Sequence, residues 1–327
     1  MQAWQVTALG EPQDVLRLDE VADLSPGPGQ VAVRVRATAA NFPDVLLCRG
    51  HYQDRPALPF TPGIELCGDV LALGDGVEGL AVGDRVLGGA VIPHGGYAEQ
   101  ALMTASDTFL APVSLDDAAA ASLHVAYQTG WFGLHRRASL QPGETLLVHA
   151  GAGGVGSAAI QLGRVAGAQV IAVVGGADKA EVARRLGADV VVDRTADDFV
   201  AVVKDVTGGR GADVVFDPVG GEAYQGSTKC VAFEGRILVV GFTSGSIPAP
   251  ALNHALVKNY SIVGLHWGLY RSKAPALVRE CYDELVRLAD AGLIAPFVSE
   301  RVGLDAVPDV LTRLGGGRTV GRVVVLP

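Results

Sequence analysis

The sequence has few cysteines and no concentration of positive charge. Its four cysteines lie far apart among 327 residues, and no two form a Cys-x-x-Cys pair. This excludes a disulfide-stapled miniprotein and is typical of a reduced, cytoplasmic protein. Lys and Arg number 26 against 35 Asp and Glu, a formal net charge of −9, with no basic run. Nucleic acids and anionic membrane surfaces are therefore poor partners.

Long apolar segments are also missing. The first five residues contain neither a basic nor an apolar region, so no secretory signal is predicted. One charge-free stretch, residues 145–163, approaches the length of a membrane span, but it contains five glycines together with His149, Ser157 and Gln161. This composition indicates a glycine-rich turn in a protein core rather than a transmembrane helix.

Glycine, by contrast, is abundant. The chain has 43 glycines, about 13% of its residues against a usual value of about 7%. Hydrophobic residues make up 49%, which excludes disorder as the explanation. The glycines must therefore serve tight turns and close approach of the backbone to something.

The length predicts two domains, and the texture of the sequence changes between them. The first third contains short strand-like segments separated by turn residues, which predict a small, mostly antiparallel β domain. These segments are residues 31–36, 66–73, 84–87 and 97–103. An Ala-rich helix is expected over residues 116–122.

From residue 144 onward, apolar strands alternate with helical segments. This alternation predicts an α/β domain with a doubly wound, parallel, six-stranded sheet of the Rossmann type. The expected strands are 145–149, 169–174, 189–192, 212–216, 236–240 and 260–263. The expected helices are 155–166, 178–186, 196–206 and 222–233, followed by a long helix over 275–291 and a last strand over 321–326.

The strongest motif follows the first of these strands. Gly151, Ala152, Gly153, Gly154, Val155 and Gly156 form a complete G-x-G-x-x-G between strand and helix. Glycines there permit a sharp turn and let backbone N–H groups and the helix N-terminus approach a pyrophosphate. The placement indicates a dinucleotide site; a purely structural glycine turn is the alternative. No G-x-x-x-x-G-K-[ST] occurs, so a P-loop nucleotidase is excluded.

The end of the second strand favours NADPH. An NAD enzyme normally carries Asp or Glu there for the ribose 2′-OH, but this chain has Val174, Gly175 and Gly176. A 2′-phosphate meets no carboxylate at that place, and Lys179 and Arg194 are near enough in sequence to pair with it. The alternative is that both are ordinary solvated charges. Asp178 is a counter-signal that we interpret as a helix cap.

These motifs together resemble the medium-chain dehydrogenase/reductase superfamily. Within it, Asn41-Phe42-Pro43-Asp44, Gly50-His51-Tyr52, Pro59 to Gly63 and Gly95 to Glu99 resemble the zinc-free quinone oxidoreductase branch. The resemblance covers essentially the whole chain. It implies a GroES-like β-rich catalytic domain over residues 1–121 and 269–327, and a Rossmann NADPH-binding domain over residues 122–268.

The resemblance also bears on metal. The zinc alcohol dehydrogenases of the superfamily carry a ligand Cys where this chain has Asn41, and Gly-His-Glu where it has Gly63-Ile64-Glu65; their Cys-rich lobe is missing here. Neither zinc site can be assembled, so we expect no metal. Glu65 is interpreted as a buried polar anchor. Cys48 and His51 are interpreted as a packed thiol and an exposed loop histidine.

Without a Lewis acid, the reaction must be one that a hydride and a few hydrogen bonds accomplish. Quinones and α,β-unsaturated carbonyl compounds meet that condition, so the sequence predicts an NADPH-dependent reductase of such substrates. Tyr52 is the candidate proton donor, because a phenol stays protonated at neutral pH; the alternative is an aromatic wall. Asn41 is expected to hydrogen-bond the substrate carbonyl or the nicotinamide ribose, with a loop-stabilising Asx turn as the alternative.

The resemblance extends the cofactor site. It places Thr129 beside the nicotinamide and Arg322 near the cofactor phosphates, where the alternative for Arg322 is a solvated charge at a strand end. Contacts to the nicotinamide are implied after the fifth and sixth strands. The residues concerned there are Phe242, Thr243, Leu265 and Trp267.

Two other functions stay open. An enoyl-thioester reductase, of enoyl-CoA or acryloyl-CoA type, would share Tyr52 and the cofactor but needs basic residues for the thioester's phosphate, which Arg49, Arg55 and Arg271 could supply. An NADPH-binding protein with little turnover would use the same glycines. Because relatives usually pair the sixth-strand edge across a two-fold axis, a homodimer is expected.

Overall fold

The computed structural model describes residues 1–327, which separate into two units. The first consists of Met1–Val125 and Ala295–Pro327, and the second of Ala126–Ile294. The boundaries expected from the sequence lie after residues 121 and 268, and these units divide after residues 125 and 294. Residues 269–294 remain with the second unit because the ring of Tyr270 packs against that of Phe132, with centroids 4.3 Å apart.

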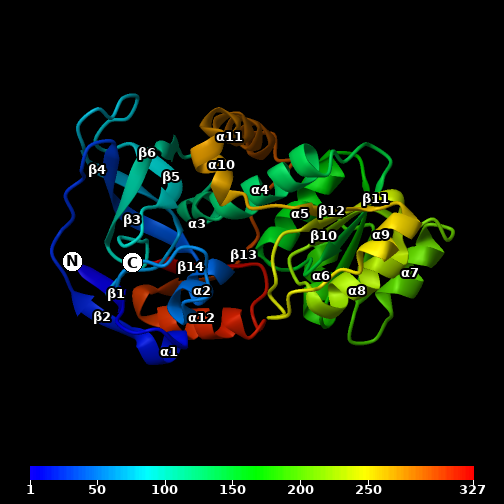
Figure 1. Ribbon diagram of the computed structural model, residues 1–327. Helices are drawn as coiled ribbons and strands as arrows, with labels where there is room; N and C mark the ends of the chain where they lie inside the picture. The colour runs from blue at the N-terminus through cyan, green and yellow to red at the C-terminus, as the bar shows by residue number, and fades with distance from the viewer. The chain divides into compact units, whose positions relative to one another are not determined.

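The first unit is built on a six-stranded sheet with the spatial order β13-β14-β3-β4-β5-β6 (Figure 1). β3 also pairs with β6, so β3, β4, β5 and β6 close on themselves. All pairs are antiparallel except β13 with β14, which confirms the predicted, mostly antiparallel β domain. The strands are β3 (Gln30–Ala39), β4 (Glu65–Leu73), β5 (Arg85–Ala90), β6 (Gln100–Leu110), β13 (Val298–Gly303) and β14 (Arg322–Leu326).

Short helices and a hairpin complete this unit. A hydrophobic core lies between α2 and α12, in which Val45, Leu47 and Phe60 meet Val310 and Leu311. The elements are β1 (Gln2–Val6), α1 (Pro12–Val15), β2 (Leu16–Glu20), α2 (Phe42–Arg49), α3 (Asp117–Ala121), the 3₁₀ turn η2 (Leu304–Ala306) and α12 (Val307–Gly315). α3 falls within the predicted Ala-rich helix, with Asp116 capping it by accepting from the Ala119 N–H at 2.8 Å.

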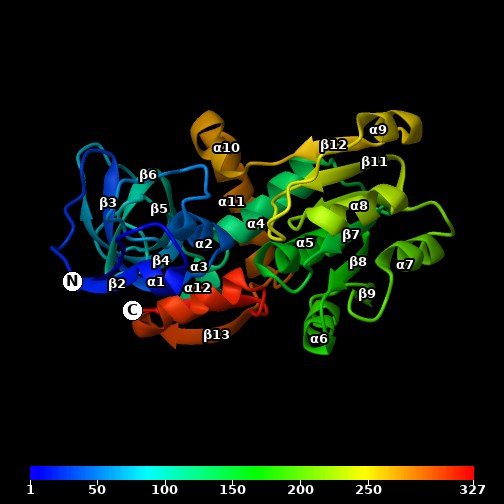
Figure 2. The same ribbon diagram turned by 60° about the horizontal axis from the view of Figure 1, so that its bottom comes forward.

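The second unit contains the predicted parallel sheet. Its spatial order, β12-β11-β10-β7-β8-β9, is that of a Rossmann fold (Figure 2). β7 is buried over its whole length, as a strand covered on both faces must be. The strands are β7 (Thr145–His149), β8 (Gln169–Val174), β9 (Val190–Asp193), β10 (Ala212–Asp217), β11 (Val231–Val239) and β12 (Ser261–Gly264).

The helices of the second unit mostly match the predicted ones. The exceptions are the helix expected over 222–233, which ends at Cys230 because β11 begins at Val231, and the one expected from 196, which begins at Phe199. The helices are α4 (His124–Trp131), which begins in the first unit, the π-helix η1 (Phe132–Arg137), α5 (Gly154–Val165), α6 (Ala177–Arg185), α7 (Phe199–Val206), α8 (Gly221–Cys230), α9 (Leu252–Lys258), α10 (Gly268–Lys273) and α11 (Pro275–Asp290). None of the chain's helices combines the length and apolar character needed to cross a membrane.

Candidate active site

The carboxylate of Asp44 accepts hydrogen bonds from three loops of the first unit. It lies in the first turn of α2, whose N-cap is Asn41. Its buried carboxylate accepts hydrogen bonds from the N–H groups of Asn41 (3.0 Å), Gly63 (3.0 Å) and Ile64 (3.1 Å), and from the Tyr97 phenol (3.0 Å). Burial raises the pKa of Asp44 to about 6, although these hydrogen bonds lower it. No spacing in the sequence predicts this four-donor site.

Asn41 belongs to a buried polar cluster with Glu65 and Arg322. Its amide nitrogen donates to the backbone oxygen of Ala39 at 2.9 Å and to Glu65 Oε1 at 2.8 Å. Arg322 donates from Nη1 to Asn41 Oδ1 at 3.0 Å and pairs through Nη2 with Glu65 Oε1. The other oxygen of Glu65, Oε2, accepts from the Val125 N–H at 2.7 Å. These residues meet because β14 and β4 both neighbour β3 in the sheet.

This cluster restricts what Asn41 can do. Both N–H groups of its amide have partners, while Oδ1 accepts from Arg322 and faces the Asp44 N–H in a capping box at the start of α2. The side chain therefore has no donor left for a carbonyl oxygen. Arg322, for its part, is no solvated charge, because only 5% of its side chain is exposed.

The same cluster does not fit a zinc ion. The Glu65 carboxylate is fully buried and neutralised by Arg322, so its role as a polar anchor is confirmed. Cys48 is buried and His51 exposed, as predicted. No group of three or more His, Cys, Asp or Glu side chains in the chain is placed to hold a metal ion.

Tyr52 follows α2 in the chain. That helix ends at Arg49 and is capped by Gly50, whose φ of +69° is a left-handed conformation that glycine adopts without strain. The His51 N–H donates to the Leu46 oxygen at 2.9 Å. The half-buried ring of Tyr52 packs against the core that includes Cys48 and Phe60. The structure thus holds Tyr52 on the same short segment as Asn41.

In the second unit, the predicted glycine loop joins β7 to α5. Gly153 is the N-cap of α5, so the loop delivers the helix N-terminus directly after the strand. A Cβ on Gly156 would lie 2.1 Å from the backbone oxygen of Ala150, so only glycine fits there. β7 adjoins both β8 and β10, where the order of the sheet reverses, and ligands of open α/β sheets bind at such a point.

The two predicted phosphate-binding cations lie close together beyond β8 and β9. The guanidinium of Arg194 packs on Gly175, 3.0 Å from where a Cβ would be. Burial lowers the pKa of Lys179, and the positive charge of Arg194 lowers it further. Asp193 lies beside them and accepts from the Gly176 N–H at 2.9 Å. Gly176, not Asp178, is the N-cap of α6, so the expected cap is wrong; Asp178 lies within the first turn.

The remaining predicted cofactor residues also belong to the second unit. Phe242 and Thr243 follow β11, and Leu265 and Trp267 follow β12, all at the carboxyl end of the sheet. The Thr243 N–H donates to Pro218 at 3.0 Å, and the Leu265 N–H donates to Val239 at 3.0 Å. Thr129 lies in α4 and is buried. The candidates thus form two sets, with only Asn41, Tyr52 and Arg322 in the first unit.

Comparison with known proteins decides the family. A model described as "Alcohol dehydrogenase GroES-like domain" matches residues 27–113, and one described as "Zinc-binding dehydrogenase" matches residues 154–287. A quinone oxidoreductase-like protein 2 homolog of Nematostella vectensis is 39% identical over 97% of this chain and 86% of its own length. The chain belongs to the quinone oxidoreductase-like family. It is thereby an oxidoreductase of the medium-chain dehydrogenase/reductase superfamily.

Solved structures agree with this family. Escherichia coli quinone oxidoreductase complexed with NADPH is 27% identical with a TM-score of 0.93, and each chain covers 100% of the other. A mycobacterial protein complexed with NADPH is 32% identical with a TM-score of 0.92 and equally complete coverage. Phthioceranic/hydroxyphthioceranic acid synthase of Mycobacterium tuberculosis is 32% identical over 98% of this chain, which spans 15% of the synthase.

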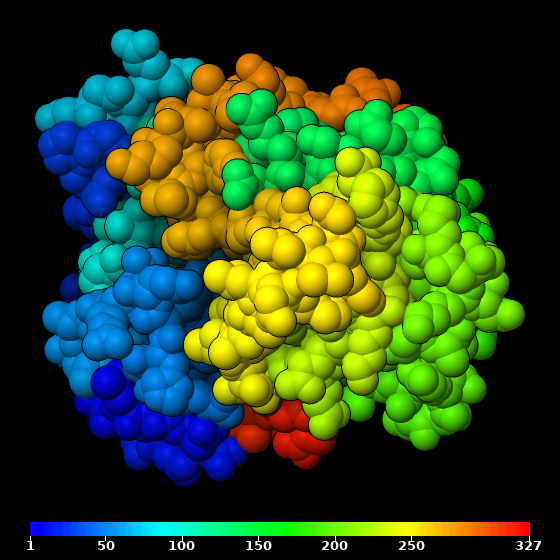
Figure 3. Space-filling model, turned by 45° about the vertical axis from the view of Figure 1, so that its right-hand side comes forward, coloured from blue at the N-terminus to red at the C-terminus, as the bar shows by residue number.

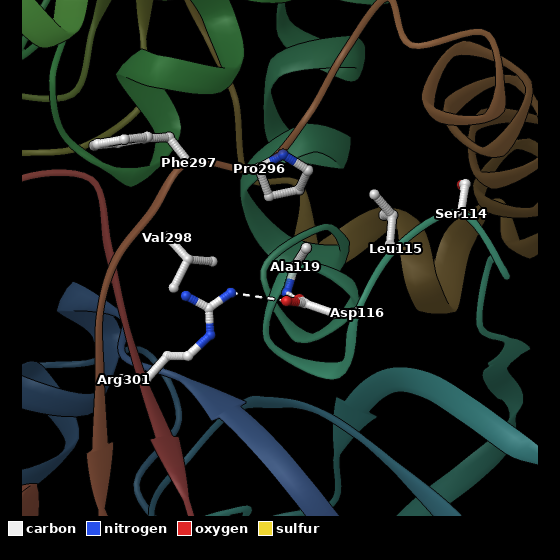
Figure 4. A pocket seen from close by; sticks show the side chains of 8 residues that line it. All are labelled: Ser114, Leu115, Asp116, Ala119, Pro296, Phe297, Val298 and Arg301. Atoms are coloured by element: carbon white, nitrogen blue, oxygen red, sulfur yellow. Dashed lines mark hydrogen bonds and ion pairs between the residues drawn. The ribbon is translucent and has the colours of Figure 1, made fainter.

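A surface hollow of this quinone oxidoreductase-like chain lies apart from these candidates. Figure 4 shows it in the first unit, where Arg301 and Asp116 form an ion pair at 2.8 Å. The Ala119 N–H is the main cause that lowers the pKa of Asp116. The lining residues are Ser114, Leu115, Asp116, Ala119, Pro296, Phe297, Val298 and Arg301. None of them is a predicted site residue.

Two buried histidines lie beside partners that are distant in the sequence. His149, the residue before the glycine loop, lies with Nε2 2.8 Å from Ser227 Oγ, and burial lowers its pKa to about 4. His124 lies with Nε2 3.3 Å from Asp107 Oδ2. Neither pair has a sequence signal, because the partners are far apart in the chain and no fixed spacing links them.

Proposed function

We propose that the protein is a zinc-independent, NADPH-dependent oxidoreductase that reduces quinones or α,β-unsaturated carbonyl compounds. The observation that carries the proposal is the buried Asn41-Glu65-Arg322 cluster. It commits the Glu65 carboxylate to a fixed cation, and four hydrogen bonds commit the neighbouring Asp44 carboxylate, which leaves hydrogen bonding as the means of polarising a substrate. Family membership supports the same class of reaction.

The second unit has residues that fit NADPH. The glycine loop and the N-terminus of α5 offer backbone N–H groups for a pyrophosphate. Lys179 and Arg194 supply two positive charges for a 2′-phosphate, and the lack of a side chain on Gly175 lets the Arg194 guanidinium pack there. Two of the solved neighbours are complexed with NADPH. When bound, NADPH supplies the hydride.

The side chains of the first unit then have distinct tasks. Tyr52 donates a proton or a hydrogen bond to the substrate oxygen on which negative charge develops. Asn41 has no free N–H for a substrate carbonyl, which favours a hydroxyl of the nicotinamide ribose as the partner of its Oδ1. Glu65 and Arg322 keep the amide in that orientation.

A steady-state assay tests the proposal. Purified protein is given NADPH with a quinone, an enone or an enoyl-CoA, and cofactor oxidation is followed for each. Turnover of the quinone or the enone with a kcat/KM well above that of the enoyl-CoA is expected. Turnover with none of the three would instead favour a binding protein.

A second candidate is an enoyl-thioester reductase. The match of 98% of this chain to part of phthioceranic/hydroxyphthioceranic acid synthase favours it. The candidate basic residues are present: Arg271 is half-buried in α10, and Arg49 pairs with Glu11 at 2.8 Å. A preference for the enoyl-CoA in the same assay would select this function.

We also propose that the protein forms a homodimer through the edge of the parallel sheet. β12 is an edge strand with a neighbour on one side only. Close to it in sequence, α9 exposes Leu252, Leu256 and Val257, each more than 70% accessible, in the yellow segment at the surface of Figure 3. Such an apolar surface beside an unpaired strand suits a second copy. Light scattering should give about twice the chain mass of 33.7 kDa, and a monomer would contradict it.

A further inference from the structure

A buried His-Asp pair in the first unit takes no part in the site described so far. His124 is the first residue of α4, and Asp107 lies in β6. Their side chains are 1% and 6% exposed, and His124 Nε2 is 3.3 Å from Asp107 Oδ2. The ring of Phe109 covers the pair, with its centroid 5.8 Å from that of the imidazole.

Burying such a pair is not an efficient way to stabilise a fold. Two charged or polar groups lose their hydration, and apolar residues of similar volume often stabilise a core as well or better. What a buried polar contact supplies is a preferred spacing, because the two side chains attract each other at 3.3 Å although the contact does not meet hydrogen-bond geometry. The pair attaches the first turn of α4 to β6 at one place.

The residue next to His124 explains why that position matters. The Val125 N–H is one of the first N–H groups of α4, which have no partner within the helix. It donates to Glu65 Oε2 at 2.7 Å, while Glu65 Oε1 holds Asn41 and Arg322. A shift of the first turn would release Oε2, allow the carboxylate to rotate, and disturb the Asn41 amide.

We propose that His124 and Asp107 are positioning residues for the Asn41-Glu65-Arg322 cluster. They act through the first turn of α4, by aiming the Val125 N–H at Glu65. This inference rests on the proposed function for its kinetic consequence. Its structural consequence, a fixed Val125 amide, is independent of the reaction.

The test uses a double variant of the full chain, His124→Phe with Asp107→Leu. Both side chains are replaced by apolar ones of similar volume, so the variant is expected to fold. We expect kcat with the preferred acceptor to fall about 10-fold or more, while the Kd for NADPH stays within about 2-fold, as for loss of a transition-state interaction. An unchanged kcat would overturn the proposal.

Two further variants separate positioning from general stability. His124→Gln retains a nitrogen donor for Asp107 and should recover kcat to within about 3-fold of wild type. Thr108→Val removes a hydrogen bond to the Thr104 oxygen, 2.8 Å long, on the same strand and should leave kcat unchanged. Equal losses of kcat in the double variant and in Thr108→Val would reduce the pair to a stabilising contact.

Hydrogen exchange gives a reading that needs no turnover. The Val125 amide should exchange at least about 10-fold faster in the double variant than in wild type, with the amides of β3 unchanged. If wild type reduces none of the acceptors, the proposed function fails, and this exchange rate still decides the inference. Equal protection in both proteins would overturn it.

Discussion

The guanidinium of Arg322 donates to the side-chain oxygen of Asn41 at 3.0 Å, across 281 positions of sequence. This one contact sets the orientation of the amide, because it fixes which end faces the cation. The nitrogen end then turns to Glu65 and the Ala39 backbone. The sequence predicted that Asn41 hydrogen-bonds the substrate carbonyl or the nicotinamide ribose. Because both N–H groups of its amide have partners, Asn41 cannot donate to a substrate carbonyl.

Metal analysis tests the absence of zinc chemistry. Arg322 and Asn41 occupy the Glu65 carboxylate. Elemental analysis of the purified protein should therefore find well under one zinc ion per protein chain. Prolonged treatment with a chelator should leave the kcat unchanged. Stoichiometric zinc that is lost together with activity would contradict the assignment.

Substitution of Tyr52 tests its role as a donor. Tyr52→Phe keeps the ring on its core and removes the hydroxyl, so kcat with an enone should fall by roughly 10²-fold, the lower end for general acid catalysis. The Kd for NADPH should not change. Tyr224→Phe, which removes a hydroxyl from α8 in the second unit, serves as the control. A normal kcat in Tyr52→Phe would make the ring a pocket wall.

Cofactor preference tests Lys179. A hydrogen bond to a charged group contributes roughly 1.5 to 3 kcal/mol, so Lys179→Ala should raise the Kd for NADPH about 10- to 150-fold. Binding of NADH should hardly change, because NADH has no 2′-phosphate. Lys204→Ala, an exposed lysine of α7, should affect neither cofactor. Equal losses for both cofactors, or a wild type that prefers NADH, would refute the interpretation of this loop.

The buried His149 predicts acid sensitivity of the second unit. Burial lowers its pKa from 6.5 to about 4, so the unfolded chain takes up the proton first as the pH falls. The contribution of His149 to stability is complete above pH 6.5 and is lost as the pH falls through about 4. Since each pH unit between the two pKa values is equivalent to about 1.4 kcal/mol, the loss is about 3 kcal/mol.

Urea unfolding between pH 7.5 and pH 4 measures this loss. His149→Gln does not titrate, so its free energy of unfolding should depend less steeply on pH than that of wild type. His51→Gln replaces an exposed ring and should keep the wild-type slope. A wild-type slope in His149→Gln would show that other groups carry the acid sensitivity.

The fold of the second unit could be predicted from the sequence because it depends on contacts between residues close together in the chain. The glycines after β7 are dictated by contacts within a few residues, such as the approach of Gly156 to the Ala150 oxygen, so their spacing alone predicts the loop. Strand and helix periodicity likewise predicted all six parallel strands. The sequence also shows that the loop after β8 has no carboxylate. The two cations near it, Lys179 and Arg194, follow in the same part of the chain. Helix caps were less certain, as Asp178 shows.

Only the tertiary structure decided the interior of the first unit. Arg322 meets Asn41 because β14 and β4 both neighbour β3, an arrangement set by long-range strand pairing that no local spacing encodes. The pairs Asp44 with Tyr97, and Asp107 with His124, arise in the same way. Each of these side chains is unremarkable in sequence. Their burial together, and the need of every buried polar group for a partner, gives them their roles.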